Sequence, residues 1–251
     1  MAGLINEQGL RLDGRKCDEM RKILAKAGVL KRADGSGYFE FGNTKAIAGV
    51  YGPRAIPKFL EEEERSVLNV IYYMAPFSTK ERAPPGPSRR SKEISLVIKR
   101  ALESVIFLEE FPRTTIDVYI EIIQADASTR CAALNAASIA LADAGIPMRD
   151  LVASVSVGKV DGRIVLDIAG KEDEEGEADM PIAYFPRRKE ITLLQMDGIM
   201  TKEEFDQAIK LAIKGCERVY KAQKEALRKK YEEMELESIV QEIENKNNLE
   251  E

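Results

Sequence analysis

The stretch from Gln124 to Arg130 (QADASTR) contains the residue types of an anion-binding site. It follows a segment rich in β-branched residues and precedes one rich in small residues, so we expect a helix to begin near Ser128. The first amides of a helix are unpaired and lie at the positive end of its dipole. Ser128 and Thr129 would add hydroxyl groups, and Arg130 a guanidinium that binds two phosphate oxygens at once. These residues predict a phosphate pocket; an ordinary capped helix with Arg130 on its surface is the alternative.

Two aspartates stand in an acidic run further along the chain, from Lys171 to Asp179. Asp179 is followed at once by an apolar segment that we expect to be a strand, and Gly176 lets the chain fold back so that Asp173 approaches it. Converging carboxylates can bind Mg²⁺, which prefers oxygen ligands, or one of them can act as a general acid on a leaving hydroxyl group. A solvated acidic loop with neither role is the alternative.

The pair Arg89 and Arg90 follows a proline-rich stretch and stands where we expect another helix to begin. Two adjacent guanidinium groups could hold a sugar–phosphate backbone without reading bases. Arg54 and Lys58, in a polar segment after the second expected strand, could extend such a path, with Phe59 available for stacking on a base. Surface solubility and salt bridges between subunits explain the same residues, because arginine is common at interfaces.

The composition restricts the chemistry that these residues can perform. The chain of 251 residues has no histidine, which excludes histidine-based triads, histidine metal sites and histidine general bases. Its three cysteines, Cys17, Cys131 and Cys216, are far apart, which argues against a disulfide framework and a zinc site. The formal net charge of −5 confines any contact with nucleic acid to a groove or pore.

The N-terminal segment, MAGLINEQGLRLDGRK, has no apolar core of signal-peptide length, and no apolar run is long enough to cross a bilayer. With 44% hydrophobic and 32% charged residues, the chain can bury a core and keep a solvated surface. We therefore expect a cytoplasmic protein.

Hydrophobic patterns predict strands grouped before helices, in two successive rounds. The expected strands are 37–41, 44–51, 67–75, 114–124, 152–160, 163–168, 180–185 and 190–196, and the expected helices are 89–106, 128–144 and one that begins near residue 201. This order indicates an α+β layered fold of two related halves, 1–150 and 151–225. The acidic run 171–179 is expected to be a loop, and the charged tail, 226–251, to be frayed or disordered.

Taken in order along the chain, several short motifs resemble those of the RNase PH family, and within it the catalytic ring subunits of the archaeal exosome. The resemblance covers residues 10–220. The motifs are RLDGR at 11–15, GNT at 42–44, YGPR at 51–54, SRR at 88–90, QAD with STR in 124–130, and GEADMP at 176–181. No single motif decides the resemblance, but the ordered set is highly specific. One departure is Ala127, which stands where many relatives carry glycine.

The resemblance implies the RNase PH fold, with two βαβα-type halves, and phosphate-dependent removal of nucleotides from RNA 3′ ends. Inorganic phosphate would be the co-substrate, bound at Ser128, Thr129 and Arg130. Asp173 and Asp179 match the family's catalytic carboxylates, with Asp173 as the acid and Asp179 supporting it or holding a divalent metal. Mg²⁺ is the expected metal, and both aspartates are its candidate ligands. Each nucleotide would leave as a nucleoside diphosphate, and the reverse reaction would add 3′ tails.

The resemblance also implies RNA contacts and partners. Arg89 and Arg90 match the pair that holds the RNA 3′ end, and Arg54 and Lys58 lie where such subunits present a pore loop. The expected partners are an inactive RNase PH-like sister subunit, which alternates with the catalytic one in a six-membered ring, and RNA-binding cap proteins. A basic sister subunit would reconcile RNA binding with the net charge of −5.

Three other interpretations stay open. A non-catalytic ring member would shape the RNA channel, but such members typically lack the set Arg130, Asp173 and Asp179. A homohexameric RNase PH that trims tRNA shares the motifs, although it fits the proline-rich stretch and the charged tail less well. An acidic α+β interaction module would catalyse no reaction. Phosphate-dependent release of nucleoside diphosphates distinguishes the enzymes from such a module.

Overall fold

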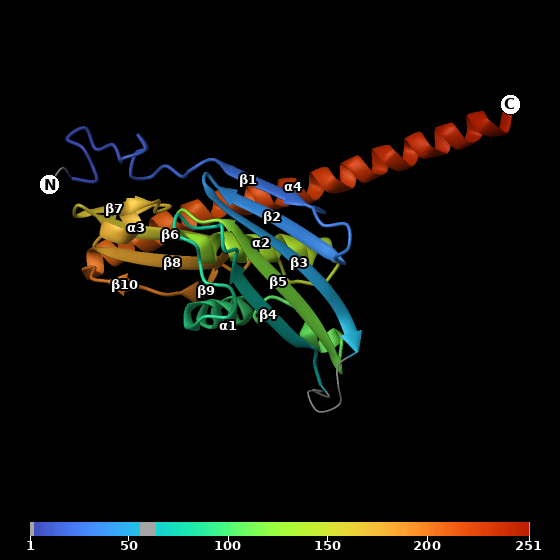
Figure 1. The fold of residues 1–251 in the computed structure, drawn as a ribbon, viewed down its shortest axis with the longest axis horizontal. Helices are drawn as coiled ribbons and strands as arrows, with labels where there is room; N and C mark the ends of the chain where they lie inside the picture. Colours follow the sequence, from blue (N-terminus) through green and yellow to red (C-terminus); the bar gives the residue numbers. More distant parts are fainter. Residues whose placement is uncertain (1–2, 56–63, 251) are drawn as a thin grey trace.

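Two β-sheets, one in each half of the chain, form the frame of the molecule (Figure 1). The computed structural model describes residues 3–55 and 64–250. The first sheet has the strand order β1-β2-β3-β5-β4 and is antiparallel except for the parallel pair β4 and β5. Its strands are β1 Ile23–Ala27, β2 Gly35–Phe41, β3 Thr44–Ala55, β4 Val67–Met74 and β5 Thr114–Gln124.

The second sheet is antiparallel and has the order β10-β8-β6-β7, with β9 also paired to β8. A tight turn joins β6 to β7 at Asp161 and Gly162, which both have positive φ, as a two-residue hairpin turn of this type requires. The strands are β6 Ala153–Val160, β7 Arg163–Leu166, β8 Ala178–Phe185, β9 Glu190–Leu194 and β10 Asp197–Gly198.

Helix α2, Thr129–Asp143, packs against both sheets and joins the two halves. Most of its side chains are small and buried, and they belong to one hydrophobic core that includes residues of both sheets. Gly37 of β2 permits this close packing, because a Cβ at that position would lie 2.3 Å from the carbonyl oxygen of Ala136. The start of α2 is thereby fixed at the junction of the two halves.

Three more α-helices complete the fold. Helix α1, Arg89–Glu103, begins at Ser88, whose Oγ accepts a 3.0 Å hydrogen bond from the backbone amide three residues on. It contacts β4 and β9 and so also bridges the halves. Helix α3, Lys171–Glu175, is a single short turn of five residues. Helix α4, Lys202–Glu250, packs along the body and then projects from it (Figure 1).

The expected strands and helices are confirmed, with ends that differ by a few residues, and so is the α+β class. Two expectations were wrong. The acidic run is not a loop throughout, because the chain turns at Gly170 (φ 48°) and Lys171–Glu175 forms α3 around the buried Glu172. The charged tail is helical, since α4 continues to Glu250; its many glutamates and lysines are strong helix formers.

In the ranges that the structure describes, none of the helices has both the length and the apolar composition needed to cross a membrane. The cytoplasmic location stays a prediction.

Candidate active site

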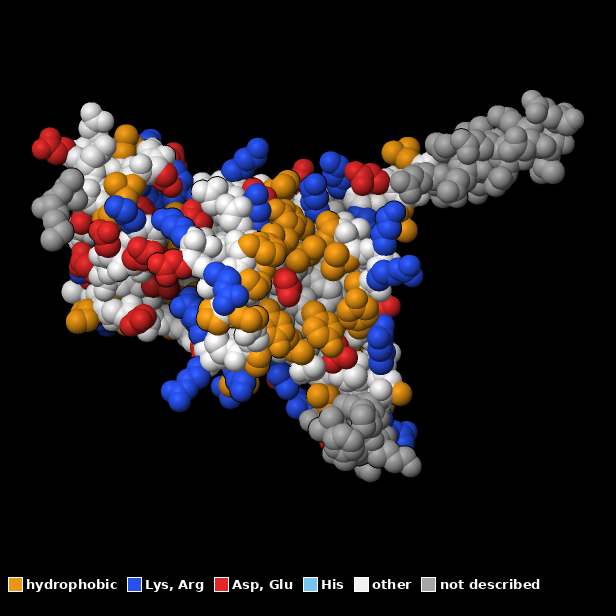
Figure 2. Space-filling model, viewed as in Figure 1, with side chains coloured by type: hydrophobic (Ala, Val, Ile, Leu, Met, Phe, Trp, Pro, Cys, Tyr) orange, Lys and Arg blue, Asp and Glu red, His pale blue; other side chains and the backbone are white. Residues whose placement is uncertain are grey.

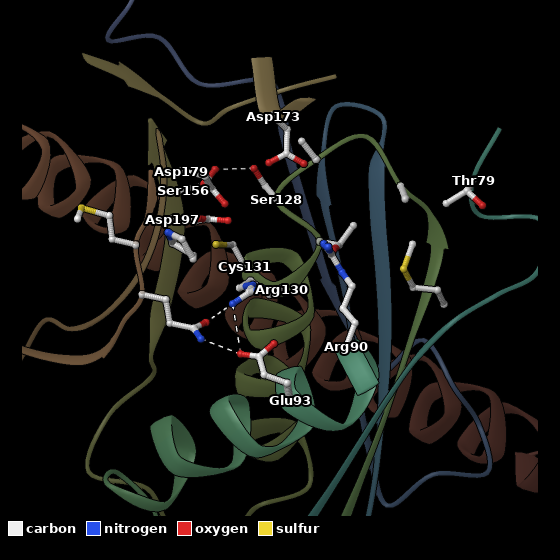
Figure 3. A pocket seen from close by; sticks show the side chains of 17 residues that line it. Thr79, Arg90, Glu93, Ser128, Arg130, Cys131, Ser156, Asp173, Asp179 and Asp197 are labelled. Carbon is white, nitrogen blue, oxygen red and sulfur yellow. Dashed lines mark hydrogen bonds and ion pairs between the residues drawn. The ribbon is translucent and has the colours of Figure 1, made fainter. Parts of the chain in front are cut away.

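A cavity of about 640 Å³ lies where the start of α2 meets the second sheet (Figure 3). Residues of α1, α2, α3, β8 and β10 line it, so both halves of the chain contribute to it. Asp173 and Asp179 face Arg90 and Arg130 across this space (Figure 3). The cavity brings together six of the side chains predicted from the sequence: Arg90, Ser128, Thr129, Arg130, Asp173 and Asp179.

The turn that precedes α2 has an uncommon backbone. Ala127 and Ser128 both have positive φ, 59° and 55°, a region that few non-glycine residues adopt. Ser128 does not cap the helix with its side chain. Its hydroxyl donates to the carbonyl of Ile168 at 2.9 Å and lies 2.6 Å from the hydroxyl of Ser156. The alternative of an ordinary capped helix is therefore wrong for this turn. Because the hydroxyl of Ser128 is already hydrogen-bonded, an anion here would depend on backbone amides of α2 and on Arg130.

Arg130 extends from the first turn of α2 into the cavity, where two polar side chains hold it (Figure 3). Its Nη1 donates to Oε1 of Gln195 and lies 3.6 Å from Oε1 of Glu93. Nε2 of Gln195 donates to the same oxygen of Glu93 at 2.7 Å. A guanidinium has five N–H donors, so these contacts orient Arg130 and leave donors for an anion.

Asp179 is the second residue of β8 and lies inside the cavity. Its Oδ1 is buried and has no hydrogen-bond partner in the described part of the chain. Burial raises the pKa of Asp179, and the charge of Asp173 raises it further, to about 6, although Arg130 and Arg90 act in the opposite direction. Asp197 pairs with it in the register of β8 and β10 and adds a third carboxylate. Asp179 is thus suited to hold a proton or a cation.

Asp173 lies on α3, at the rim of the same cavity. It keeps accessible surface, but the surrounding protein removes water from its carboxyl group, and this desolvation raises its pKa. The charge of Arg90 lowers the pKa and that of Glu174 raises it. The two carboxyl groups and the two arginines therefore interact electrically across the cavity.

The pair of aspartates suits a hard divalent cation. Mg²⁺ keeps several of its waters and is usually held by one or two carboxylates together with phosphates of the substrate. Asp173 and Asp179 offer such a pair, and the unpartnered Oδ1 of Asp179 is a buried oxygen that a cation would satisfy. Among residues 3–55 and 64–250 there is no cluster of three or more His, Cys, Asp or Glu placed to hold a metal, so a cage made by protein alone is not offered.

The other predicted RNA contacts do not line the cavity. Arg89 is exposed at the first position of α1. Arg54, at the end of β3, lies over the ring of Tyr51 at 4.8 Å and 3.4 Å from a carboxylate oxygen of Asp34. Lys58 falls outside the described residues. Contact of these three basic residues with RNA stays a prediction.

Comparison with known proteins decides the family. The family model described as "3′ exoribonuclease family, domain 1" matches residues 19–147, and the one described as domain 2 matches residues 150–215. This chain belongs to the RNase PH family. It is accordingly a 3′→5′ exoribonuclease of that family.

Relatives and solved structures agree with this RNase PH assignment. The exosome complex component Rrp41 of Pyrococcus furiosus is 62% identical over 91% of this chain and 92% of its own length. That of Methanopyrus kandleri is 59% identical over 91% and 96%. The crystal structure of rice Rrp46 has a TM-score of 0.77 at 25% identity, covering 86% of this chain and 100% of that one. The Archaeoglobus fulgidus exosome with RNA bound to the active site has a TM-score of 0.74 at 23% identity, covering 89% and 93%. The RNase PH fold is thereby confirmed.

Several polar residues that line the cavity of this RNase PH chain were missed by sequence reasoning, among them Glu93, Ser156, Gln195 and Asp197. Glu93 lies on a helix that was expected, but periodicity identifies its buried face and not the direction of a polar residue. Asp197 carried a signal, because a carboxylate after an expected strand and before Gly198 is held near an ordered element. Gln195 and Ser156 carried none.

Proposed function

We propose that this chain is the phosphorolytic subunit of an exosome ring, which releases nucleoside diphosphates from RNA 3′ ends. The observation that carries the proposal is a single cavity in which Arg130 faces Asp173 and Asp179 (Figure 3). An anion at Arg130 and a phosphodiester beside the carboxylates would meet there. Relatives that are 55% to 62% identical are named exosome components, which supports assembly into such a ring.

In the proposed reaction, an oxygen of inorganic phosphate attacks the phosphorus of the last phosphodiester. A P–O bond forms as the bond to the 3′ oxygen of the preceding nucleotide breaks, which yields a nucleoside diphosphate and a chain shortened by one nucleotide. Phosphoryl transfer depends on in-line placement and charge neutralisation more than on covalent help. Arg130 and the first amides of α2 neutralise the attacking anion. Asp173 protonates the leaving 3′ oxygen, and the reverse reaction adds nucleotides.

Mg²⁺ is the cofactor that we propose, and the residues fit it. Asp179 is its principal ligand, because its buried Oδ1 has no other partner in the described structure, and Asp173 lies close enough to influence its pKa. When bound, the ion supplies positive charge that stabilises the phosphate oxygens. The ion would also satisfy the buried Oδ1 of Asp179, which has no hydrogen-bond partner in the described structure.

RNA and protein partners complete the proposal. Arg90 lines the cavity, and we propose that Arg89 and Arg90 together hold the RNA 3′ end. Exposed apolar side chains gather over the first sheet (Figure 2), and Leu30, Tyr51 and Tyr119 line a shallow hollow on that surface. Such a surface suits burial against another protein. The partners are an inactive RNase PH-like sister subunit in a six-membered ring and RNA-binding cap proteins.

An assay on radiolabelled poly(A) tests the function. The chain assembled with its sister subunit should release nucleoside diphosphates at a rate that depends on phosphate concentration. Asp173→Ala should lower the rate by about a hundredfold or more, because positioned acids typically contribute about 10²–10⁴-fold. Release of monophosphates without added phosphate would contradict the proposal, as would unchanged activity in Asp173→Ala.

A further inference from the structure

The RLDGR motif at 11–15 lies outside the cavity, and the proposed reaction gives it no role. Arg11 is nonetheless only 3% exposed, and each nitrogen of its guanidinium donates a hydrogen bond. Nε donates to Oε1 of Glu172 at 2.7 Å, and Nη2 donates to Oε2 of the same carboxylate. Nη1 donates to the carbonyl of Leu166 at 2.6 Å, and Nη2 to that of Asp167 at 2.8 Å. Arg11 therefore ties the end of β7 to α3.

Helix α3 depends on contacts with other parts of the chain, because a helix of five residues is not stable by itself. A single turn forms few internal hydrogen bonds and does not offset the cost of nucleating a helix. Its first residue follows Gly170, which has φ 48° and adds no side-chain cap. Glu172 is the one buried residue of the five and is 3% exposed. The position of α3 is therefore set mainly by what holds Glu172.

Glu172 is held on both carboxylate oxygens. Besides Arg11, it accepts a 3.0 Å hydrogen bond from the amide of Ala169, the residue two places before α3 begins. Asp173 follows Glu172 directly and lines the cavity, while Glu172 is directed into the protein. A shift of Glu172 would carry Asp173 with it, since adjacent residues of one helical turn move as a unit.

We propose that Arg11, acting through Glu172, is the positioning residue that holds the carboxyl group of Asp173 at the cavity. This inference rests on the proposed catalytic role of Asp173. Arg11 of the RLDGR motif, near the start of the chain, would thereby position Asp173 in the second half. Arg11 does not contact the reacting atoms, so its effect is confined to the placement of Asp173.

A second tie makes this role separable from folding. Arg21 donates to both carboxylate oxygens of Asp167, at 3.0 and 2.6 Å, and to the carbonyl of Asp126 at 2.6 Å. It thus joins the connection before α3 to the turn before α2, and in the described structure it forms no hydrogen bond or ion pair with Glu172. When Arg11 is changed, Arg21 still anchors the connection, so α3 should shift locally while the rest of the fold stays intact.

Arg11→Lys in the assembled complex tests the proposal. Lysine keeps the charge, but it lacks the planar fork with which Arg11 bonds both carboxylate oxygens of Glu172 while also reaching the two carbonyls. We expect kcat on poly(A) to fall about tenfold or more, because a misplacement of about 1 Å can cost about a hundredfold. The KM for inorganic phosphate should stay within about twofold, since Arg11 does not touch Arg130. Hydrogen exchange should accelerate at 169–177 and stay unchanged at 128–132.

A second test replaces the partner of Arg11 with Glu172→Gln. Its matched control is Asp143→Asn. Both changes remove the charge of a buried carboxylate in an ion pair, but Asp143 pairs with Lys230 at the far end of α2. Both variants should therefore lose thermal stability, while kcat should fall only in Glu172→Gln. A purely structural role for Glu172 would give the two variants the same kinetic behaviour and would overturn the proposal.

The outcomes separate this inference from the proposed function. Unchanged exchange at 169–177 in Arg11→Lys, or an unchanged kcat beside an inactive Asp173→Ala, would overturn the positioning role. Full activity in Asp173→Ala would overturn the proposed role of Asp173, whether or not exchange at 169–177 depends on Arg11.

Discussion

Arg130 forms an ion pair with Glu93, which places a carboxylate beside the predicted phosphate site. Glu93 lies 3.6 Å from its Nη1 and is also bonded to Gln195, so a phosphate would bind near a like charge. Glu93→Gln keeps an oxygen that can accept from Gln195 and removes that charge. We expect the KM for phosphate to fall by about two- to fivefold, because a partly exposed ion pair is worth up to about 1 kcal/mol. Phosphate titrations of the poly(A) reaction measure this.

Glu103→Gln is the matched control for this change. It removes one negative charge from the same helix, where Glu103 pairs with Lys99 and does not line the cavity. The KM for phosphate should be unchanged in this variant. An equal decrease in both variants would mean that general charge and not the contact with Arg130 is responsible.

Asp179 is expected to reduce the stability of the chain at neutral pH. Its pKa is about 6 in the folded chain, against a usual value of 3.8. The folded state therefore binds the proton more tightly than the unfolded state does. The contribution of Asp179 to stability should be most favourable below the lower pKa and should be lost as pH rises through about 6. A shift of about two units corresponds to about 3 kcal/mol.

Asp179→Asn should accordingly be more stable than the original chain at about pH 7.5 and equally stable at about pH 3.5. Urea unfolding in the presence of a chelator, at both pH values, measures the difference. The chelator matters because a cation bound by Asp179 would lower its pKa. Equal stability of Asp179→Asn and the original chain at about pH 7.5 would show that the charged form of Asp179 does not destabilise the folded state.

At the scale of elements, the turn before α2 carries backbone strain. Ala127 has φ 59°, and a left-handed non-glycine residue costs about 1–2 kcal/mol. Ala127→Gly should raise the free energy of unfolding by about 0.5–1 kcal/mol, after the greater flexibility of unfolded glycine is subtracted. Ala144→Gly, at the other end of the helix with φ −74°, should instead lower it. Thermal unfolding of both variants provides the comparison.

The sequence predicted most elements because their patterns are local. Strand β5 was expected at 114–124, where it lies, and Ser88 was expected to precede a helix, which it caps. Helix α3 was missed because its five residues carry no period and are held by Arg11, which lies far away in the sequence. The helical tail was missed because its charges were taken as a sign of disorder although they are also good helix formers.

At the scale of the whole molecule, the two halves make one site. Arg130 comes from the helix at their junction, Asp173 and Asp179 come from the second half, and Glu93 comes from the first. The sequence indicated the first three residues, because Arg130 stands at the start of an expected helix, Asp179 stands just before an expected strand, and Asp173 stands in the acidic run that leads to that strand. It could not indicate Glu93 or Gln195, whose approach to Arg130 depends on packing between distant segments.

Isotope transfer tests the central claim most directly. The assembled complex would be given poly(A) and inorganic phosphate labelled with ³²P, and the released nucleotides would be separated and counted. Attack by phosphate predicts that the label appears in the outer phosphate of nucleoside diphosphates, one for each nucleotide removed. Unlabelled nucleoside monophosphates, released at the same rate without phosphate, would show that water attacks and would contradict the account.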